Sequence, residues 1–291
     1  MTETSLIKAR SWLFAPGDSA KKMGKAADGE ADIVLLDLED SVMPESKSAA
    51  RVTVHAFLAS RADRHRLWVR INPLSGEDAR IDLEAIMPAA PGGIFLPKAE
   101  GKADVEALDQ MLSELEAKHG IAAGSTKVAA LVTETPKAMF TTGEYAGSPR
   151  LVAMSWGAED LSSALGARVQ FQASGQYMPT FELARSLCLV GAVAAGAAPI
   201  ETIQSDFRDL DGLKERALMV RSQGYRGMLA IHPAQVPVIN DAFTPSEEEL
   251  AHARAIIAAF DADSGAGTVG LNGAMLDRPH LDLAKALLAS A

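Results

Sequence analysis

The chain has 291 residues, of which 48% are hydrophobic and 23% are charged, a composition typical of a globular protein. The formal net charge of −10 argues against a nucleic-acid partner, which requires a basic face. A single cysteine excludes an internal disulfide framework, and no apolar run approaches the roughly 18 residues of a membrane span. No signal-peptide segment is apparent either, so we expect a cytoplasmic protein without membrane contact, in which Cys188 is buried.

Short apolar runs alternate with longer amphipathic stretches along the chain. The predicted strands cover residues 12–15, 33–38, 67–71, 93–96, 128–133, 151–155, 198–202 and 228–231. The clearest helical patterns cover residues 46–60, 102–119, 181–195 and 210–223. Strands that alternate with helices indicate a parallel sheet, and eight such repeats predict a (β/α)₈ TIM barrel, here over residues 1–243. A doubly wound open sheet is the structural alternative.

Polar side chains follow six of the predicted strands directly. They are Asp37, Glu39 and Asp40 after the second strand, Arg70 after the third, Lys98 after the fourth, Glu134 after the fifth, Glu159 and Asp160 after the sixth, and His232 after the eighth. The carboxyl ends of barrel strands converge on one mouth, where barrel enzymes place their catalytic groups. We therefore expect these side chains to meet at one rim.

Two of these residues, Glu134 and Asp160, follow adjacent strands. Their charges would repel each other unless a cation lay between them. Oxygen ligands in small number are typical of Mg²⁺, and the sequence has no His/Cys cluster with zinc spacing. Arg70 offers a planar donor pair for a carboxylate or an enolate oxygen. The rim thus predicts metal-assisted stabilisation of an enolate, with a salt-bridge network closing the barrel top as the alternative.

A basic cluster on a predicted helix could bind a polyanion. It comprises Lys21, Lys22 and Lys25, with Arg10 just upstream, and the alternative is a solvated helix face.

The remaining residues, 244–291, form a predicted C-terminal helical extension. A helix begins at Pro245-Ser246-Glu247, a glycine-rich stretch covers residues 265–273, and Asp277 precedes a final helix. Glycines that flank a short segment are typical of a hinge, so this region could be a lid or a flexible linker to a packing helix. Residues 265–270 match a dinucleotide-binding fingerprint, but they follow a predicted helix, not a strand, which excludes that function.

Short motifs spread over nearly the whole chain resemble those of one enzyme family. They are residues 10–17 (RSWLFAPG), 37–42 (DLEDSV), 70–73 (RINP), 96–98 (LPK), 134–136 (ETP), 157–161 (GAEDL), 231–233 (IHP) and 273–277 (GAMLD). In this order and spacing they resemble the citrate lyase β-subunit-like family of the HpcH/HpaI aldolase superfamily, which also contains malyl-CoA and citramalyl-CoA lyases.

The resemblance implies roles for particular residues. Glu134 and Asp160 look like the ligands of Mg²⁺, with Mn²⁺ as the alternative ion, and Arg70 looks like the group that holds a thioester or carboxylate oxygen. Asp277 looks like an aspartate delivered into a neighbouring subunit, which implies a homotrimer or a hexamer. Asp37 and Glu39 are expected to belong to the same catalytic site. The implied coenzyme A groove comprises Phe14, Lys21, Lys22, Ile231, His232 and Pro233.

The activity implied by this resemblance is that of a Mg²⁺-dependent acyl-CoA lyase. Such an enzyme cleaves or forms the carbon–carbon bond between a coenzyme A thioester and a small keto acid. Three alternatives remain open: a malyl-CoA-type thioesterase, a subunit that acts only within a citrate lyase complex, and an aldolase that acts on keto acids without coenzyme A.

Overall fold

The computed structural model describes residues 8–263, 265 and 267–290, which form two compact units. The first unit ends at Asn240 and the second begins at Asp241. Within the described residues, no helix combines the length and the apolar character that crossing a lipid bilayer requires.

The first unit is a closed barrel of eight parallel strands in sequential order, in which β1 pairs with both β2 and β8. The strands are β1 (Ser11–Pro16), β2 (Ile33–Asp37), β3 (Leu67–Arg70), β4 (Gly93–Leu96), β5 (Lys127–Leu131), β6 (Leu151–Ser155), β7 (Ala198–Glu201) and β8 (Gly227–Ala230). The predicted (β/α)₈ barrel is therefore confirmed, and the open sheet is excluded.

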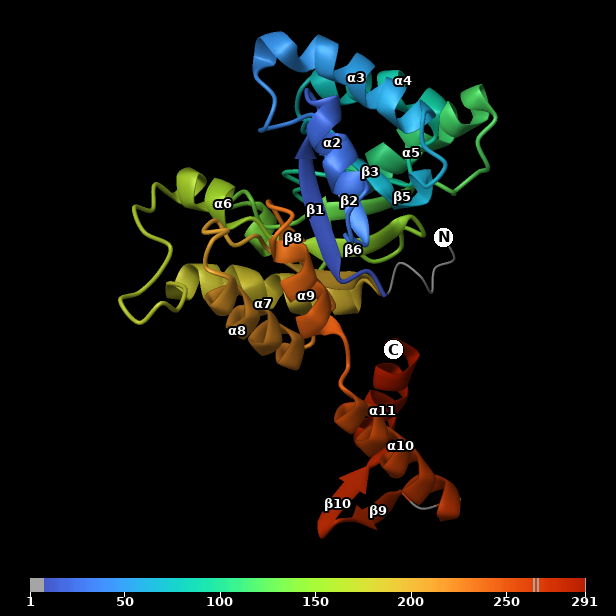
Figure 1. Cartoon of the computed structure of the whole chain (residues 1–291), viewed down its shortest axis with the longest axis vertical. Coiled ribbons are helices and arrows are strands. Elements are labelled where there is room, and N and C mark those ends of the chain that lie inside the picture. Colours follow the sequence, from blue (N-terminus) through green and yellow to red (C-terminus); the bar gives the residue numbers. More distant parts are fainter. Residues whose placement is uncertain (1–7, 264, 266, 291) are drawn as a thin grey trace. The chain divides into compact units, whose positions relative to one another are not determined.

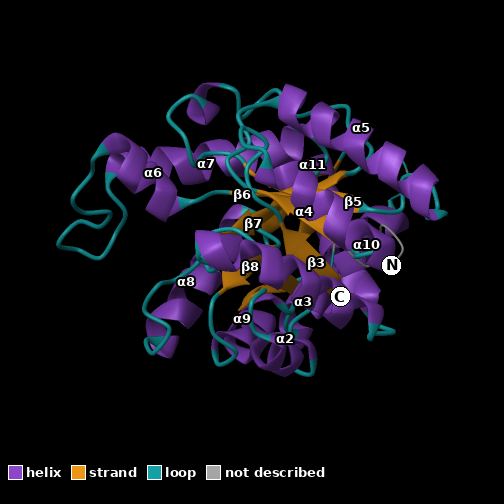
Figure 2. Ribbon diagram, turned by 90° about the horizontal axis from the view of Figure 1, so that it is seen from above, coloured by secondary structure: helices purple, strands orange, loops and turns teal. Residues whose placement is uncertain are grey.

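Helices surround the strands, which lie in the centre of Figure 2. They are α2 (Ala20–Ala27), α3 (Lys47–Ala59), α4 (Asp78–Ile86), α5 (Lys102–His119), α6 (Ala158–Leu165), α7 (Pro179–Ala194), α8 (Leu210–Gln223) and α9 (Gln235–Phe243). The barrel pattern is irregular after β5, where a single 3₁₀ turn (Ala138–Phe140) replaces the usual helix, and after β6, where two helices follow (Figure 1). Pro136, Gly143, Gly147 and Pro149 interrupt any helical pattern in the first of these connections.

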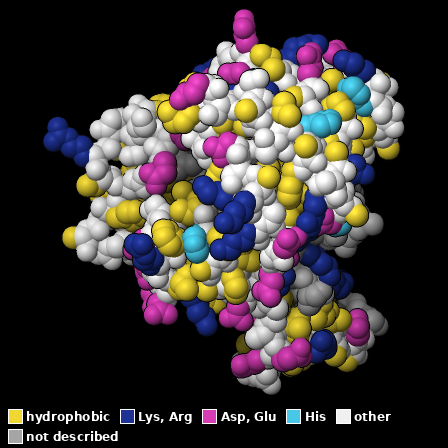
Figure 3. Space-filling view, turned by 45° about the horizontal axis from the view of Figure 1, so that its top comes forward, with side chains coloured by type: hydrophobic (Ala, Val, Ile, Leu, Met, Phe, Trp, Pro, Cys, Tyr) yellow, Lys and Arg dark blue, Asp and Glu magenta, His cyan; other side chains and the backbone are white. Residues whose placement is uncertain are grey.

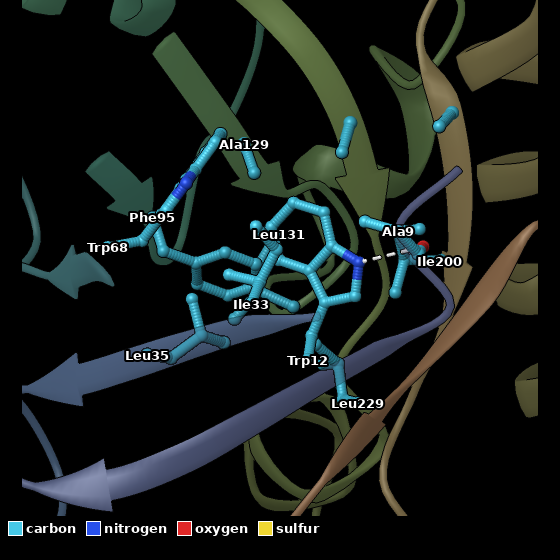
Figure 4. Close-up of a cluster of buried hydrophobic side chains, with 12 residues drawn as sticks. Ala9, Trp12, Ile33, Leu35, Trp68, Phe95, Ala129, Leu131, Ile200 and Leu229 are labelled. Carbon is cyan, nitrogen blue, oxygen red and sulfur yellow. Dashed lines mark hydrogen bonds between the residues drawn. The ribbon is translucent and has the colours of Figure 1, made fainter. Parts of the chain in front are cut away.

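Large apolar side chains fill the barrel interior, as Figure 4 shows. Trp12 packs edge-on against Trp68 with ring centroids 5.2 Å apart, and its indole N–H donates to the carbonyl oxygen of Ala9 (3.3 Å). The aromatic rings bury a large area, although the buried indole N–H of Trp68 has no hydrogen-bond partner among the described residues. Because the interior is apolar, the polar side chains of the predicted site lie at the carboxyl ends of the strands. Cys188 on α7 is buried with a free thiol, as predicted.

The predicted basic cluster is only partly correct. Arg10 precedes β1 and lies at the amino end of the strand, where its Nε is 3.0 Å from Asp32 Oδ2. Lys21, Lys22 and Lys25 are exposed on α2, which follows the carboxyl end of the same strand. Arg10 is thus paired with Asp32 at the amino end of β1, whereas Lys21 and Lys22 lie in the first turn of α2, beyond its carboxyl end.

The second unit begins its main helix, α10 (Glu247–Ala262), where the sequence predicts it. Ser246 and Glu249 form a reciprocal capping box at its first turn. A final helix, α11 (Arg278–Ser290), packs on α10, and the two helices share a small core that includes Phe260 and Leu281.

The glycine-rich stretch is not a plain linker, which corrects that alternative. Strands β9 (Thr268–Leu271) and β10 (Ala274–Asp277) pair as an antiparallel hairpin. The turn residues Asn272 and Gly273 have φ of 50° and 81°, the left-handed geometry that a two-residue hairpin turn requires. Of the segment that matches the dinucleotide fingerprint, Ala266 lies outside the described residues, and the preceding element is a helix as expected.

Candidate active site

A cavity of about 390 Å³ opens at the carboxyl ends of the barrel strands. Predicted site residues that line it are Phe14, Asp37, Arg70, Glu134, Asp160 and Ile231. The structure thus brings together side chains from six different strand exits. Leu131, Trp156 and Leu229 form an apolar part of the wall, so the cavity has an apolar side and a charged side.

Arg70, at the end of β3, is held in a fixed orientation. Its Nε and Nη2 each donate to one oxygen of Asp37 at 2.7 Å, and its Nη1 lies 3.0 Å from Glu39 Oε2. The guanidinium also lies 4.7 Å from the centre of the Phe14 ring. Burial acts to raise the pKa of Asp37, but the charge and hydrogen bonds of Arg70 outweigh it and lower that pKa. Asp37 therefore has the contacts of a residue that positions Arg70.

Lys98, just after β4, connects the charged groups of the rim. Its Nζ lies 2.6 Å from Glu39 Oε1 and 3.2 Å from Asp160 Oδ1. Its backbone N–H donates to Glu134 Oε2 at 2.6 Å. The φ of Lys98 is 50°, a left-handed conformation that is uncommon for a residue with a side chain and is often found at functional sites.

Glu134, after β5, is almost completely buried, with 3% of its surface exposed. Burial, together with the negative charges of Asp160 and Glu39, raises the pKa of Glu134 to about 8. A Cβ atom at Gly157 would lie 2.6 Å from Glu134 Cγ, so the close approach of the two chains requires glycine there. Glu134 is a carboxyl group whose ionised form needs a nearby cation.

Asp160 lies in the first turn of α6, and its side chain is partly exposed. The amino terminus of a helix carries a partial positive charge that favours a carboxylate. Asp160 and Glu134 line the same cavity, and the charge of each acts on the other.

A magnesium ion fits this donor set. Five carboxylates, Asp37, Glu39, Asp40, Glu134 and Asp160, share the rim with two cations, Arg70 and Lys98. In the described part of the chain, no group of three or more His, Cys, Asp or Glu side chains is arranged to hold a metal. The protein would therefore supply two oxygen ligands, and water and substrate the others, as is typical of Mg²⁺.

The predicted salt-bridge network also exists, as the contacts of Arg70 and Lys98 with Asp37, Glu39 and Asp160 show. It does not close the barrel top, because the cavity lies beside it.

The residues predicted to form a coenzyme A groove occupy neighbouring strand exits, since β1 pairs with β8. Phe14 and Ile231 line the cavity. The ring of His232 stacks on Phe207 with centroids 4.6 Å apart, and Pro233 accepts a backbone hydrogen bond from Val236. Figure 3 shows Lys and Arg side chains interspersed with Asp and Glu over the face that it presents.

Asp277 lies in the second unit, at the end of β10 and directly before α11. Its Oδ1 is 2.5 Å from Nδ1 of His280, and both side chains are about half exposed. No motif in the sequence pointed to His280.

Comparisons with known proteins identify the family of this chain. The sequence profile of the family described as "HpcH/HpaI aldolase/citrate lyase" matches residues 10–233. The chain belongs to this family. A "Citrate lyase subunit beta-like protein" of Mycobacterium tuberculosis is 36% identical over 280 residues, covering 96% of this chain and 94% of that protein. A "(3S)-malyl-CoA thioesterase" of Cereibacter sphaeroides is 32% identical over 288 residues, covering 97% of this chain and 94% of that protein.

A solved member of the HpcH/HpaI family has the same fold. The crystal structure of the protein CitE from Mycobacterium tuberculosis, in complex with magnesium, acetoacetate and coenzyme A, superposes with a TM-score of 0.81. The two proteins are 35% identical, and the match covers 97% of this chain and 98% of that one.

Sequence reasoning missed two features of the site. The first is Lys98, which follows a strand like the other rim residues. No sequence pattern predicts its left-handed backbone conformation or its contacts with Glu134, Glu39 and Asp160. Trp156 lies in the cavity wall, and its indole N–H donates to the buried Glu201 at 3.1 Å. Its position directly after β6, among other rim residues, was the available signal.

Proposed function

We propose that this protein is a Mg²⁺-dependent acyl-CoA lyase. Its substrate would be a 3-hydroxyacyl-CoA thioester of the malyl-CoA, citramalyl-CoA or citryl-CoA type, and its products acetyl-CoA or propionyl-CoA and a small keto acid. The relatives in the HpcH/HpaI family, and the CitE complex with magnesium and coenzyme A, support this class of reaction.

One observation carries the proposal. Two carboxylates from adjacent strand exits, Glu134 and Asp160, line one cavity beside a positioned guanidinium, that of Arg70. Burial and neighbouring negative charge make the ionised form of Glu134 costly until a cation binds. A bound Mg²⁺ would polarise the oxygens of the keto acid portion and stabilise negative charge there, with Mn²⁺ as a substitute.

The chain's own residues then bind and orient the substrate. Arg70, held by Asp37 and Glu39, presents donors to the thioester oxygen, on which negative charge develops. The proposed coenzyme A groove comprises Phe14, Lys21, Lys22, Ile231, His232 and Pro233.

Asp277 acts from a neighbouring subunit, in a homotrimer or a hexamer. Size-exclusion chromatography with light scattering would establish that oligomeric state.

Proton transfers accompany the cleavage of the carbon–carbon bond. The β-hydroxyl group loses its proton to solvent water, the bond to the α-carbon breaks, and the electron pair of that bond leaves on the thioester fragment as an enolate. Arg70 stabilises the enolate oxygen. Asp277 protonates the enolate carbon as a general acid, and in the reverse reaction it removes that proton as a general base.

A screen in the direction of synthesis tests the proposal. Acetyl-CoA and propionyl-CoA would each be incubated with glyoxylate, pyruvate and oxaloacetate, with Mg²⁺ and with EDTA. We expect a condensed thioester from at least one pair, formed only when the metal is present. The absence of product from all six pairs, or equal formation in EDTA, would contradict the assignment.

A thioesterase is the second candidate, and it is favoured by the similarity to the (3S)-malyl-CoA thioesterase. The two reactions release different products from malyl-CoA. A thioesterase releases free coenzyme A thiol and malate, whereas a lyase releases glyoxylate and keeps the thioester. Measuring thiol and keto acid in the same sample distinguishes them.

A subunit of a citrate lyase complex is the third candidate, since other relatives carry the name "Citrate lyase subunit beta". Such a subunit would be inactive alone on every coenzyme A thioester and active only with its partners. Turnover by the purified single chain would exclude it, and turnover of a keto acid without coenzyme A would instead indicate a simple aldolase.

A further inference from the structure

Lys98 contacts the proposed cation site in two separate ways. Its backbone N–H holds Glu134 Oε2 at 2.6 Å, and its side-chain Nζ lies 3.2 Å from Asp160 Oδ1. The backbone of Lys98 is left-handed, with a φ of 50°. Non-glycine residues in this conformation cost free energy, so the surrounding contacts must stabilise it.

The two contacts have different consequences for a divalent ion. The backbone N–H binds one oxygen of Glu134 and keeps the side chain in place beside Gly157, while the other oxygen is left for a cation. The ammonium group, in contrast, neutralises Asp160 and repels any second cation that approaches it. A Mg²⁺ ion that takes Asp160 as a ligand has to displace the ammonium from that oxygen.

The ammonium has a second carboxylate to retain it. Glu39 Oε1 lies 2.6 Å from Lys98 Nζ and is almost completely buried, so its ion pair is the shorter and less solvated of the two. Lys98 can therefore release Asp160 and remain bound to Glu39.

We propose that Lys98 is a positioning residue whose ammonium group is a built-in counter-ion of Asp160, and that it sets the affinity of the site for the divalent cation. This inference rests on the proposed metal site at Glu134 and Asp160. The inference goes beyond that site because it identifies the Lys98 ammonium as a cation that competes with the metal for Asp160. The free energy of displacing this ammonium lowers the affinity for the metal in the absence of substrate.

The test is metal binding without substrate, with Mn²⁺ as the probe and the electron paramagnetic resonance signal of free Mn²⁺ as the readout. Lys98→Met removes the ammonium and keeps the backbone N–H. We expect its Kd for Mn²⁺ to fall by about tenfold, the scale of removing one positive charge a few ångströms from a partly exposed site. Lys102→Met is the matched control, because Lys102 pairs with Glu106 on the exposed face of α5. Its Kd should equal that of the wild type.

A second variant controls for a change in the backbone conformation at position 98. Lys98→Gly also removes the ammonium but favours the left-handed conformation, so it should show the same tighter binding. A Kd that is unchanged or higher in both variants, or undetectable Mn²⁺ binding in all four proteins, would overturn the inference. Because no substrate is present, this result is independent of whether the lyase reaction itself is observed.

Discussion

Replacing Glu134 by glutamine should change how the stability of the metal-free protein depends on pH. Glutamine has the same shape and keeps an oxygen that accepts the Lys98 backbone N–H, but it carries no charge. Glu134 has a pKa raised from 4.5 to about 8 by burial and by the charges of Asp160 and Glu39.

The sign and size of the effect follow from that pKa. A carboxyl group with a raised pKa in the folded state binds its proton more tightly there than in the unfolded chain. Its stabilising contribution is complete below about pH 4.5 and is lost as the pH rises through about 8. A change from 4.5 to about 8 corresponds to about 5 kcal/mol, at about 1.4 kcal/mol for each tenfold change in proton affinity.

Urea unfolding in EDTA between about pH 5 and 8.5 measures this difference directly. We expect Glu134→Gln to gain about 4 kcal/mol of stability relative to the wild type across this range, because an unfolded-state carboxyl is already mostly ionised at pH 5. The exposed Glu106→Gln should follow the wild-type profile. Parallel profiles for Glu134→Gln and the wild type would refute the buried, charge-crowded environment of Glu134.

Three further predictions concern the reaction. Asp160→Ala and Glu134→Ala should lose Mg²⁺ dependence and nearly all activity, and wild-type turnover of either variant in EDTA would show that the metal assignment is wrong. Asp277→Ala should keep its oligomeric state in light scattering while its turnover falls by about 10²-fold or more, the scale of a lost acid–base group, and full activity would exclude the role of Asp277. Arg70→Lys should lower kcat/KM by about tenfold or more, because lysine cannot make the bidentate contact with Asp37, and unchanged kinetics would show that this geometry is unimportant.

The sequence predicted the barrel because its strands are short, apolar and regularly spaced. Each of the eight predicted strands overlaps an observed one, and no end differs by more than two residues. The hairpin of β9 and β10 was missed because the glycines around it suggested a linker. Asn272-Gly273 between two four-residue strands was the signal that could have revealed it.

The candidate site was predictable where it depends on topology alone. Asp37, Arg70, Glu134 and Asp160 follow strands whose carboxyl ends must converge, and the structure places all four at one cavity. A salt-bridge network at the rim was foreseen as an alternative, but which residues pair within it could not be predicted, since the pairing depends on side-chain geometry.

Arg10 shows the opposite error, in which closeness in sequence was taken for closeness in space. It lies before β1 and pairs with Asp32, whereas Lys21 and Lys22 begin α2 beyond the other end of that strand.

The most direct test is the location of a divalent ion in a crystal soaked with Mn²⁺, by its anomalous scattering. The proposed site predicts a peak about 2.1 Å from an oxygen of Glu134 and of Asp160, with the Lys98 ammonium withdrawn towards Glu39. A peak elsewhere, or none while Lys98 Nζ remains on Asp160, would contradict it.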